Sequence, residues 1–442
     1  MRACRLAVLV MLLGLTPSAG AQSALQARVD ALIPTVEAGV IADRRHFHQH
    51  PELGNREFKT SAFIAKRLKS LGYEVRTGVA KTGVVGTLRG GKPGPVVALR
   101  ADMDALPVVE EVDLPFASKV RTTFDGKDVG VMHACGHDAH MAILLGVAKV
   151  LADVREDLPG TVKLIFQPAE EGAPEGEEGG AKLMVQEGVL RDEPKPSAIF
   201  GLHVFSFYDA GTLAWRAGGL LASSDTMLVT VKGRQTHGAM PWQGVDPITV
   251  AAQIVLALQT IPSRQMDITK APTLISIGKI EGGVRNNIIP DEVVMKGTIR
   301  ALDPAMRTAL MERITRTATE IAASAGATAT VEFGKEVAYP VTFNDPALTE
   351  RMQPTLARAT KGAKLVQADP IMGAEDFSFF AQEIPGLYLA LGSRKPGTPA
   401  AEAPANHSPK FHLDESGMLL GVRALADLAV DYLASAPAPL AP

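Results

Sequence analysis

The chain has 442 residues, a length that suggests two or three domains at about 150 residues each. Its 45 Lys and Arg residues against 48 Asp and Glu give a net charge of −3, which excludes the strongly basic surface typical of nucleic-acid-binding proteins. Hydrophobic residues make up 46% of the chain, as in ordinary globular proteins. Only two cysteines, Cys4 and Cys135, are present, which excludes a disulfide framework.

Residues 1–21 have the three parts of a secretory signal peptide. Arg2 and Arg5 give a positive start, Leu6–Leu15 is an apolar run, and Ala19–Ala21 forms an A-x-A cleavage pattern. This run of ten residues is too short for the roughly 20 that span a bilayer, so we predict no membrane anchor. The sequence therefore predicts export, to the periplasm or by secretion, after cleavage near Ala21.

The segment 22–223 alternates predicted helices with predicted strands. The helices cover 25–50, 60–71 and 138–152, and the strands cover 84–88, 96–99, 162–166 and 198–203. Residues 170–180 are rich in Gly and Glu and predict a loop. This alternation favours the α/β class, with a sheet flanked by helices.

The pattern changes in residues 224–334. Strands are predicted at 226–231, 273–280, 293–299 and 328–333, and helices at 246–261 and 303–325. Each of these helices begins with Asp-Pro, an N-cap followed by proline at the first helical position. The order β-α-β-β-α-β predicts an inserted α+β domain of ferredoxin-like type.

The α/β pattern resumes in residues 335–434, with a helix at 346–359, a strand at 387–391 and a last helix from Leu413. Residues 435–442 are rich in Ala and Pro and are predicted to be disordered. The chain is thus predicted to hold a signal peptide, an α/β domain in two parts (22–223 and 335–434) and the inserted domain between them.

The string Met132–His140 concentrates possible metal ligands. Cys135 and His137 flank a glycine just ahead of a predicted helix, and His133 and His140 are close by. Thiolate and imidazole suit borderline transition metals, and a bend at the glycine can aim both at one point. The sequence therefore predicts a metal site here, against the alternative of a buried structural cysteine beside unrelated histidines.

A pair of carboxylates, Glu170 and Glu171, follows a buried strand, which is where α/β proteins place functional groups. Adjacent carboxylates repel, so a loop that holds both near one centre needs a cation or a shared proton. One can bind metal while its neighbour accepts a proton from water. The alternative is a solvated acidic loop.

Further acids and histidines lie at the ends of predicted strands or in loops. Asp102 and Asp104 follow one strand, His203 ends another, and His407 lies in a Pro-rich loop. Each is weak alone, but together they fit a metal site and the residues that orient its ligands.

Three histidines, His46, His48 and His50, resemble a metal-binding tract. Positions i, i+2 and i+4 of a helix do not share one face, so we predict structural roles for them.

The chain resembles the metal-dependent amidohydrolases that include hippurate hydrolases, N-acyl-amino-acid hydrolases and auxin-conjugate hydrolases, within the larger group of dinuclear aminoacylases and carboxypeptidases. The resemblance covers nearly the whole mature chain. It rests on the strings RRHFHQHPELG (44–54), LRADMDALP (99–107), MHACGHDAHMA (132–142), QPAEEG (167–172), GRQTHGAMPW (233–242), GGVRNNIIPDE (282–292) and MGAEDF (372–377). It implies a zinc-peptidase-like catalytic domain with a mixed central sheet flanked by helices, plus an inserted lid and dimerisation domain.

The resemblance implies two divalent metal ions per subunit, of manganese, zinc, cobalt or nickel. It assigns Cys135 as the ligand shared by both metals, Glu170 as the general base and Asp104 as a residue that orients a ligand. The complete implied ligand set is Cys135, His137, Glu171, His203 and His407.

The resemblance also implies a homodimer formed through the inserted domain. His237 would reach a partner subunit's site and stabilise the oxyanion. Asn287, with Arg285, would hold the substrate's free carboxylate. Glu375 is assigned to substrate binding and is the alternative candidate for the base. The loop Gly172–Gly180 is longer than the family pattern, so the acyl group and the amino-acid preference stay open.

The predicted function is that of an exported dinuclear-metal amidohydrolase. It would act on N-acyl amino acids or short peptides with a free carboxylate, using metal-activated water and Glu170 as base. A dipeptidase or carboxypeptidase remains open within this class, and a non-catalytic exported metal- or peptide-binding protein is the alternative outside it. No G-x-S-x-G or Walker A string occurs, which argues against a serine hydrolase and a nucleotide enzyme.

Overall fold

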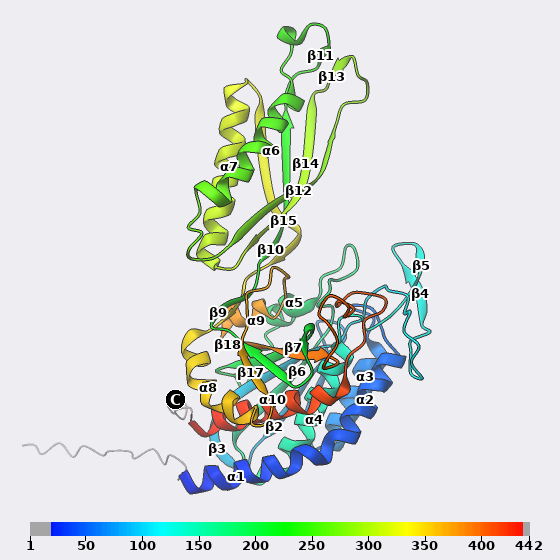
Figure 1. Cartoon of the computed structure of the whole chain (residues 1–442), viewed down its shortest axis with the longest axis vertical. Helices are drawn as coiled ribbons and strands as arrows, with labels where there is room; N and C mark the ends of the chain where they lie inside the picture. The colour runs from blue at the N-terminus through cyan, green and yellow to red at the C-terminus, as the bar shows by residue number, and fades with distance from the viewer. Residues whose placement is uncertain (1–18, 436–442) are drawn as a thin grey trace, which may run out of the picture.

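The structure is a computed structural model that describes residues 19–435. The positive start and apolar run of the predicted signal peptide, and the tail from 436, lie outside the described residues. The chain forms two bodies, a catalytic domain and an inserted domain that stands on it (Figure 1). No helix within residues 19–435 combines the length and apolar character needed to cross a membrane.

The catalytic domain is built on an eight-stranded mixed sheet with the order β1-β2-β6-β3-β7-β18-β8-β17. Strand β3 runs parallel to β6 and β7, and β7 runs parallel to β18, whereas β1 and β2 are antiparallel additions at one edge. The strands are β1 (Glu74–Val79), β2 (Gly83–Arg89), β3 (Lys92–Asp102), β6 (Pro159–Gln167), β7 (Ile199–Asp209), β8 (Thr212–Trp215), β17 (Lys364–Gln367) and β18 (Gly386–Arg394).

Helices cover both faces of this sheet, which is why its central strands are hydrophobic on both sides. In β3, Val97 and Leu99 belong to one core cluster and Ala98 to another, as alternate side chains of a strand must. The first cluster packs against α1 (Ala19–Leu32), α2 (Glu37–Gln49), α3 (Phe58–Ser70), α4 (His137–Asp153), α8 (Pro346–Ala359) and α10 (Met418–Ser435). The second lies under α5 (Gly180–Gln186) and α9 (Ser378–Glu383).

The inserted domain has the predicted β-α-β-β-α-β order and its own hydrophobic core. Its sheet is antiparallel throughout, in the order β12-β14-β10-β15. The elements are β10 (Ser224–Lys232), α6 (Pro247–Arg264), β12 (Thr273–Gly282), β14 (Glu292–Ala301), α7 (Pro304–Ser324) and β15 (Thr328–Tyr339). Asp246 and Asp303 cap the two helices as predicted, each accepting from backbone N–H groups of the first turn.

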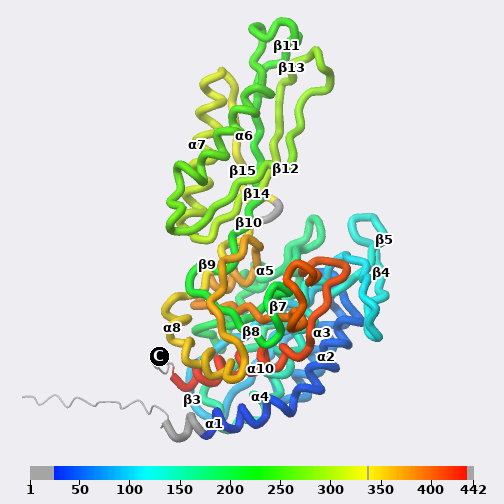
Figure 2. The backbone as a smooth tube through the Cα atoms, viewed as in Figure 1, coloured from blue at the N-terminus to red at the C-terminus, as the bar shows by residue number. Residues whose placement is uncertain are grey.

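The chain enters the inserted domain through β10 and leaves it through β15 (Figure 2). Strand β15 runs to Tyr339, five residues past the predicted boundary at 334, and Tyr339 is paired with Ser224 at the start of β10. A short pair, β11 (Thr236–His237) with β13 (Ile288–Ile289), forms the end of this domain that is remote from the catalytic sheet (Figure 1).

Several local predictions need correction. The helix predicted over 25–50 is interrupted by a 3-10 helix at Ile33–Val36, because Pro34 lacks a backbone N–H and disfavours a continuous α-helix. The last helix begins at Met418 instead of Leu413, since Asp414 caps a separate short 3-10 turn, Glu415–Gly417.

Short elements were missed. They include the hairpin of β4 (Arg121–Phe124) and β5 (Lys127–Gly130), and the pair of β9 (Gly218–Leu221) with β16 (Thr342–Asn344).

Gly136 sets the start of α4, so its substitution tests the local fold. Its φ is 97°, and a Cβ built there would lie 2.3 Å from Val204 Cγ2. Because the left-handed conformation costs an L-residue roughly 1–2 kcal/mol, Gly136→Ala should lower the free energy of unfolding by at least about 1 kcal/mol in urea titrations. The matched control is Gly39→Ala in α2, where a Cβ meets nothing within 4 Å and should be neutral or stabilising. Equal unfolding midpoints for the two variants would contradict this account.

Candidate functional site

The candidate site forms where the carboxyl ends of three neighbouring parallel strands meet the start of α4. Asp104 follows β3, Glu170 follows β6, and His203 comes from β7. Cys135 lies just before α4. Such a strand edge is the usual ligand site of open α/β sheets. One prediction was wrong in detail, because β7 continues to Asp209 and His203 lies inside the strand instead of ending it.

The predicted metal ligands converge around the Cys135 thiol. Cys135 Sγ lies 3.2 Å from His203 Nε2 and 3.2 Å from His407 Nε2. His407 Nε2 in turn lies 3.0 Å from Glu171 Oε1. Two sets of ligand atoms, each within 4.8 Å of one another, share this thiol: Cys135–His137–His203 and Cys135–Glu171–His407. The thiol therefore lies between two possible metal positions.

The imidazole rings are oriented as metal ligands usually are. His137 Nδ1 lies 2.8 Å from the Asp104 carbonyl oxygen, and His203 Nδ1 lies 2.7 Å from the Val204 carbonyl oxygen. A ring whose Nδ1 is held in this way presents Nε2 as the free ligand atom. His137 Nε2 is buried and has no hydrogen-bond partner among residues 19–435, an arrangement that suits a bound cation. These residues fit a pair of divalent metal ions.

Asp104 connects two parts of the site. Its Oδ2 accepts the backbone N–H of Glu171 at 3.0 Å, and its Oδ1 lies 3.3 Å from His137 Nδ1. Asp104 thus contacts two of the predicted ligand residues, the role of orienting a ligand remaining a prediction.

Glu170 is buried at the same strand edge, with Oε2 3.9 Å from His137 Nε2. Carboxylate oxygens of Glu375 and Asp376 lie within 4.8 Å of one of its own. Burial and the neighbouring negative charges of Glu375, Glu171 and Asp376 raise the pKa of Glu170 well above its ordinary value. The residue next to the predicted metal ligands is therefore suited to hold a proton.

The electrostatics of the ligands call for added positive charge. Burial, then Glu171 and Glu170, raise the pKa of the Cys135 thiol well above its ordinary value. Burial lowers the pKa of His137, but Asp102 and Asp104 outweigh it and raise that pKa to about 10. Bound divalent cations would favour the thiolate and the neutral imidazole, so metal binding should release protons.

A network behind the site was not predicted from the sequence. Arg100 is fully buried and lies 2.7 Å from Asp102, 2.9 Å from Glu375 and 3.0 Å from Asp376. Tyr388 donates to Glu375 Oε2 at 2.7 Å. Glu375, predicted to bind substrate, is thus buried beside Glu170 and is held by Arg100 and Tyr388. The sequence signals for the network were Arg100 within the LRADMD string and Glu375 with Asp376 within the MGAEDF string.

His140 is a further buried histidine of the predicted metal string. Its Nδ1 lies 2.6 Å from Asp102 Oδ1, and its Nε2 accepts the Val204 backbone N–H at 2.9 Å. Both ring nitrogens are in use, so His140 supports the site from behind instead of offering a ligand atom.

His46, His48 and His50 do not form a metal site within the described chain. His48 is buried between Asp138 at 2.9 Å and Glu110 at 3.1 Å. His46 stacks on Phe63, with ring centroids 4.5 Å apart. These contacts agree with the structural roles predicted for them.

The three residues predicted on the inserted domain gather at its remote end. His237 is paired with Ile288, and Gly238 donates to the Asn287 carbonyl oxygen at 2.8 Å. His237, Asn287 and Arg285 are exposed there. The structure therefore brings these residues together at the end formed by β11 and β13, which lies far from α4, the helix that follows Cys135 (Figure 1).

A cleft of about 670 Å³ separates the site from the base of the inserted domain. Glu170, Glu171, Arg300 and Tyr339 contribute to its lining. Tyr339, at the end of β15, donates its hydroxyl to the Glu170 carbonyl oxygen at 2.8 Å. The connection to the inserted domain thus contacts the loop that carries the candidate base.

Comparisons with known proteins agree with this geometry. The model for peptidase family M20/M25/M40 matches residues 98–431. Thermostable carboxypeptidase 1 of Saccharolobus solfataricus is 43% identical over 398 residues, covering 90% of this chain and 96% of that protein. The IAA-amino acid hydrolase ILR1-like 2 of Arabidopsis thaliana is 38% identical, covering 90% of this chain and 86% of that protein.

Among solved structures, the YXEP protein of Bacillus subtilis, described as a dinuclear metal binding peptidase, superposes with a TM-score of 0.76. It is 35% identical, and the match covers 90% of this chain and 99% of that one. Together with the converging ligand set, these matches show that the chain belongs to peptidase family M20/M25/M40 and is a metal-dependent hydrolase.

Proposed function

We propose that this chain is an exported dinuclear-metal amidohydrolase that cleaves the amide bond of N-acyl amino acids. The observation that carries the proposal is the convergence of four other ligand residues on the Cys135 thiol beside a buried Glu170. A binding protein without catalysis would have no use for a buried acid in that position. Carboxypeptidase activity on short peptides is the second candidate, favoured by the name of the 43% identical relative.

The chemistry divides between the metals and the side chains. Two divalent ions, of manganese, zinc, cobalt or nickel, would polarise the amide carbonyl and acidify a water molecule. Glu170 accepts a proton from the attacking water at its carboxylate and delivers it to the leaving amine nitrogen. Asp104 holds His137 and the Glu171 backbone, so the ligands and the base keep a fixed relation.

A homodimer would complete the site. Strand β12 is an edge strand that pairs only with β14 in its four-stranded sheet, and its side chains Leu274 and Ile280 are exposed. Leu256 on the neighbouring α6 is also exposed. An edge with apolar side chains favours pairing with a second copy about a two-fold axis.

In such a dimer each inserted domain would act as a lid. His237 would reach the partner subunit's site and stabilise the oxyanion. Asn287 and Arg285 would bind the free carboxylate of the substrate. The exposure of all three side chains at one end of the domain supports this proposal, because it leaves them accessible to a partner subunit.

Export is the remaining part of the proposal. It rests on the signal-peptide pattern in residues 1–21. The mature chain would keep Cys135 as its single thiol, and metal ligation would protect it in an oxidising compartment.

A hydrolysis panel tests the substrate class. The metal-reconstituted enzyme should hydrolyse N-acetyl, N-benzoyl or indole-acetyl amino acids faster than dipeptides with a free amino group. Methyl esters of the best substrate should react at least about 10-fold more slowly, since truncating one partner of a charge pair costs at least 1.4 kcal/mol. Faster cleavage of dipeptides would show that the enzyme is a dipeptidase instead of an aminoacylase. Equal rates for the best substrate and its methyl ester would refute recognition of the free carboxylate.

Glu170→Gln tests the base. The variant should keep its metal content and lower kcat by roughly 10²–10⁴, the usual contribution of general acid–base catalysis. The matched control is Glu175→Gln, an exposed acid on the following loop, which should leave kcat unchanged. A near-normal kcat for Glu170→Gln in steady-state assays would remove Glu170 from this role.

His237→Ala tests the shared site. Loss of one oxyanion donor should lower kcat about 10²–10³-fold without loss of metal. Mixing His237→Ala with Glu170→Gln subunits should then restore activity, because each heterodimer has one site with both residues intact. A mixture that exchanges subunits, as shown by native mass spectrometry, and stays inactive would contradict sharing between subunits.

A further inference from the structure

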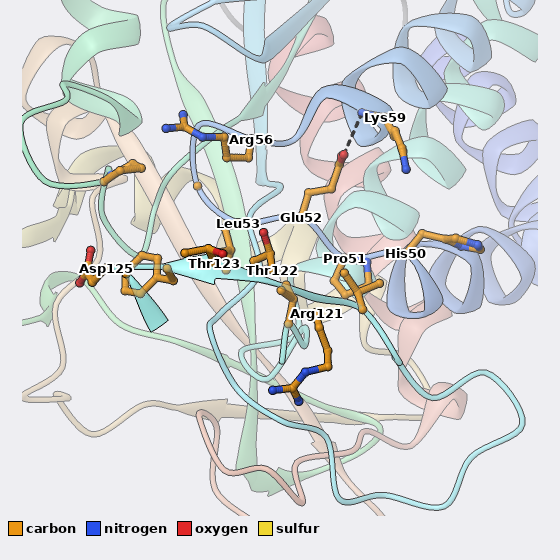
Figure 3. A pocket seen from close by; sticks show the side chains of 16 residues that line it. His50, Pro51, Glu52, Leu53, Arg56, Lys59, Arg121, Thr122, Thr123 and Asp125 are labelled. Atoms are coloured by element: carbon orange, nitrogen blue, oxygen red, sulfur yellow. Dashed lines mark hydrogen bonds between the residues drawn. The ribbon is translucent and has the colours of Figure 1, made fainter. Parts of the chain in front are cut away.

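A second cavity, of about 600 Å³, lies outside the metal-ligand cluster. It is formed between residues 50–59, which connect α2 to α3, and the β4–β5 hairpin (Figure 3). None of Cys135, His137, Glu171, His203 and His407 lines it. Its volume lies in the range of about 300–1,000 Å³ that small-molecule sites occupy.

The floor of this cavity is apolar. Leu53 and Val131 are buried there, and Val120 and Phe124 pack against them from the hairpin side. A floor of this kind favours an aromatic or branched aliphatic group.

The rim carries three cationic side chains beside the acids Glu52 and Asp125. Figure 3 shows Arg56 and Lys59 on one side of Leu53 and Arg121 on the other. Arg56 pairs with Glu177 and Arg121 with Asp128, but Lys59 Nζ forms no ion pair with any residue of the described range 19–435. A cation free of protein partners beside an apolar floor suits a ligand with one negative charge.

The acidic residue of the same wall is already engaged. Glu52 accepts the backbone N–H groups of Lys59 at 3.2 Å and Thr60 at 2.9 Å, and the Thr60 hydroxyl at 3.0 Å. Its charge is therefore directed to the N-terminal turn of α3, where an anion is stabilised by the helix dipole. Asp125, at the tip of the hairpin, is the other acid among the lining residues.

The wall of the cavity contacts the two loops that carry Asp104 and Glu170. The Glu52 carbonyl oxygen accepts the backbone N–H of Ala105 at 2.8 Å, next to Asp104. Glu57 Oε1 accepts the backbone N–H of Ala169 at 2.9 Å, next to Glu170. Gly54 lies so close that a Cβ there would be 2.8 Å from the Gly172 carbonyl oxygen. Residues 52–57 therefore lie between the cavity and the candidate active site, and they contact both the Asp104 loop and the Glu170 loop.

We propose that this cavity is a second ligand site, specific for small amphipathic monocarboxylates such as aryl acids. The carboxylate binds at Lys59, the apolar group rests on Leu53 and Phe124, and residues 52–57 transmit occupancy to the Glu170 loop. Binding is independent of the proposed function, whereas its effect on turnover rests on it. The free acid released from an N-acyl amino acid belongs to this ligand class, so the site would respond to product.

Calorimetric titration of the metal-loaded enzyme with benzoate tests the binding claim. We expect benzoate to occupy a site in addition to any binding at the metals. Lys59→Glu should weaken that second site at least 10-fold, and so should Thr123→Trp, which fills the cavity from the hairpin. The matched control is Lys66→Glu, an exposed lysine on the same helix that does not line the cavity and should bind as the wild type does.

Three outcomes would overturn the proposal. The first is a single benzoate site that competes with substrate and is unchanged in both cavity variants. The second is equal affinity for neutral benzamide, which would show that the carboxylate is not recognised. The third is a kcat that does not change with benzoate, which would end the claim of coupling even if the site binds. Calorimetry measures benzoate binding even if the protein has no amidohydrolase activity. A failure of the proposed function can therefore be distinguished from a failure of the second ligand site.

Discussion

The central constraint in this structure is the burial of many carboxylates at one strand edge. Asp102, Asp104, Glu170, Glu375 and Asp376 are each at most 6% exposed, and three of them, Asp102, Glu375 and Asp376, share the buried guanidinium of Arg100. Buried charge is tolerated only when it is paired and hydrogen-bonded. Arg100 and His137 together do not balance five carboxylates, and the upward shifts of the pKa values of Glu170 and Asp376 express the remaining imbalance. Divalent cations at the Cys135 cluster would relieve it.

The fold supplies the rigidity that such a site needs. Arg100 links β3 to the start of the Glu170 loop through Gln167, at 2.8 Å, and to β18 through Tyr388, at 3.0 Å. The left-handed Gly136 turns the chain into α4, so that Cys135 and His137 face the same centre. The inserted domain, in contrast, joins the rest of the chain through β10 and β15 alone, and Tyr339 at that junction contacts the Glu170 loop. Rigid ligands and a separately supported domain suit an enzyme that closes over its substrate.

Much of this architecture could be predicted from the sequence because its signals are local. The Asp-Pro helix starts and regular strand spacing predicted the element order of the inserted domain, and the Cys135–His137 string indicated candidate metal ligands that the fold brings together. The β4–β5 hairpin also had a local signal, since Asp125-Gly126 is a typical two-residue turn, and both residues have positive φ. Hydrophobic periodicity gives no signal for this hairpin, because most of its residues are exposed.

Other features depend on contacts between distant segments. The roles of Arg100, His140 and Glu375 follow from buried partners as far away as Asp376 and Val204, which no local pattern announces. The function of His237, Asn287 and Arg285 depends on how one inserted domain meets a catalytic domain. The structure of one chain shows these residues together at the remote end, and the shared site stays a proposal.

The most direct test of the account is anomalous X-ray scattering from crystals of the metal-loaded enzyme, collected at the absorption edge of the bound metal. The account predicts two metal peaks per subunit, both within bonding distance of Cys135 Sγ, at about 2.3 Å for zinc. One should also contact His137 and His203, and the other Glu171 and His407. A single peak, or peaks centred on Asp102 and His140 without contact to Cys135, would contradict the ligand assignment on which the proposed chemistry depends.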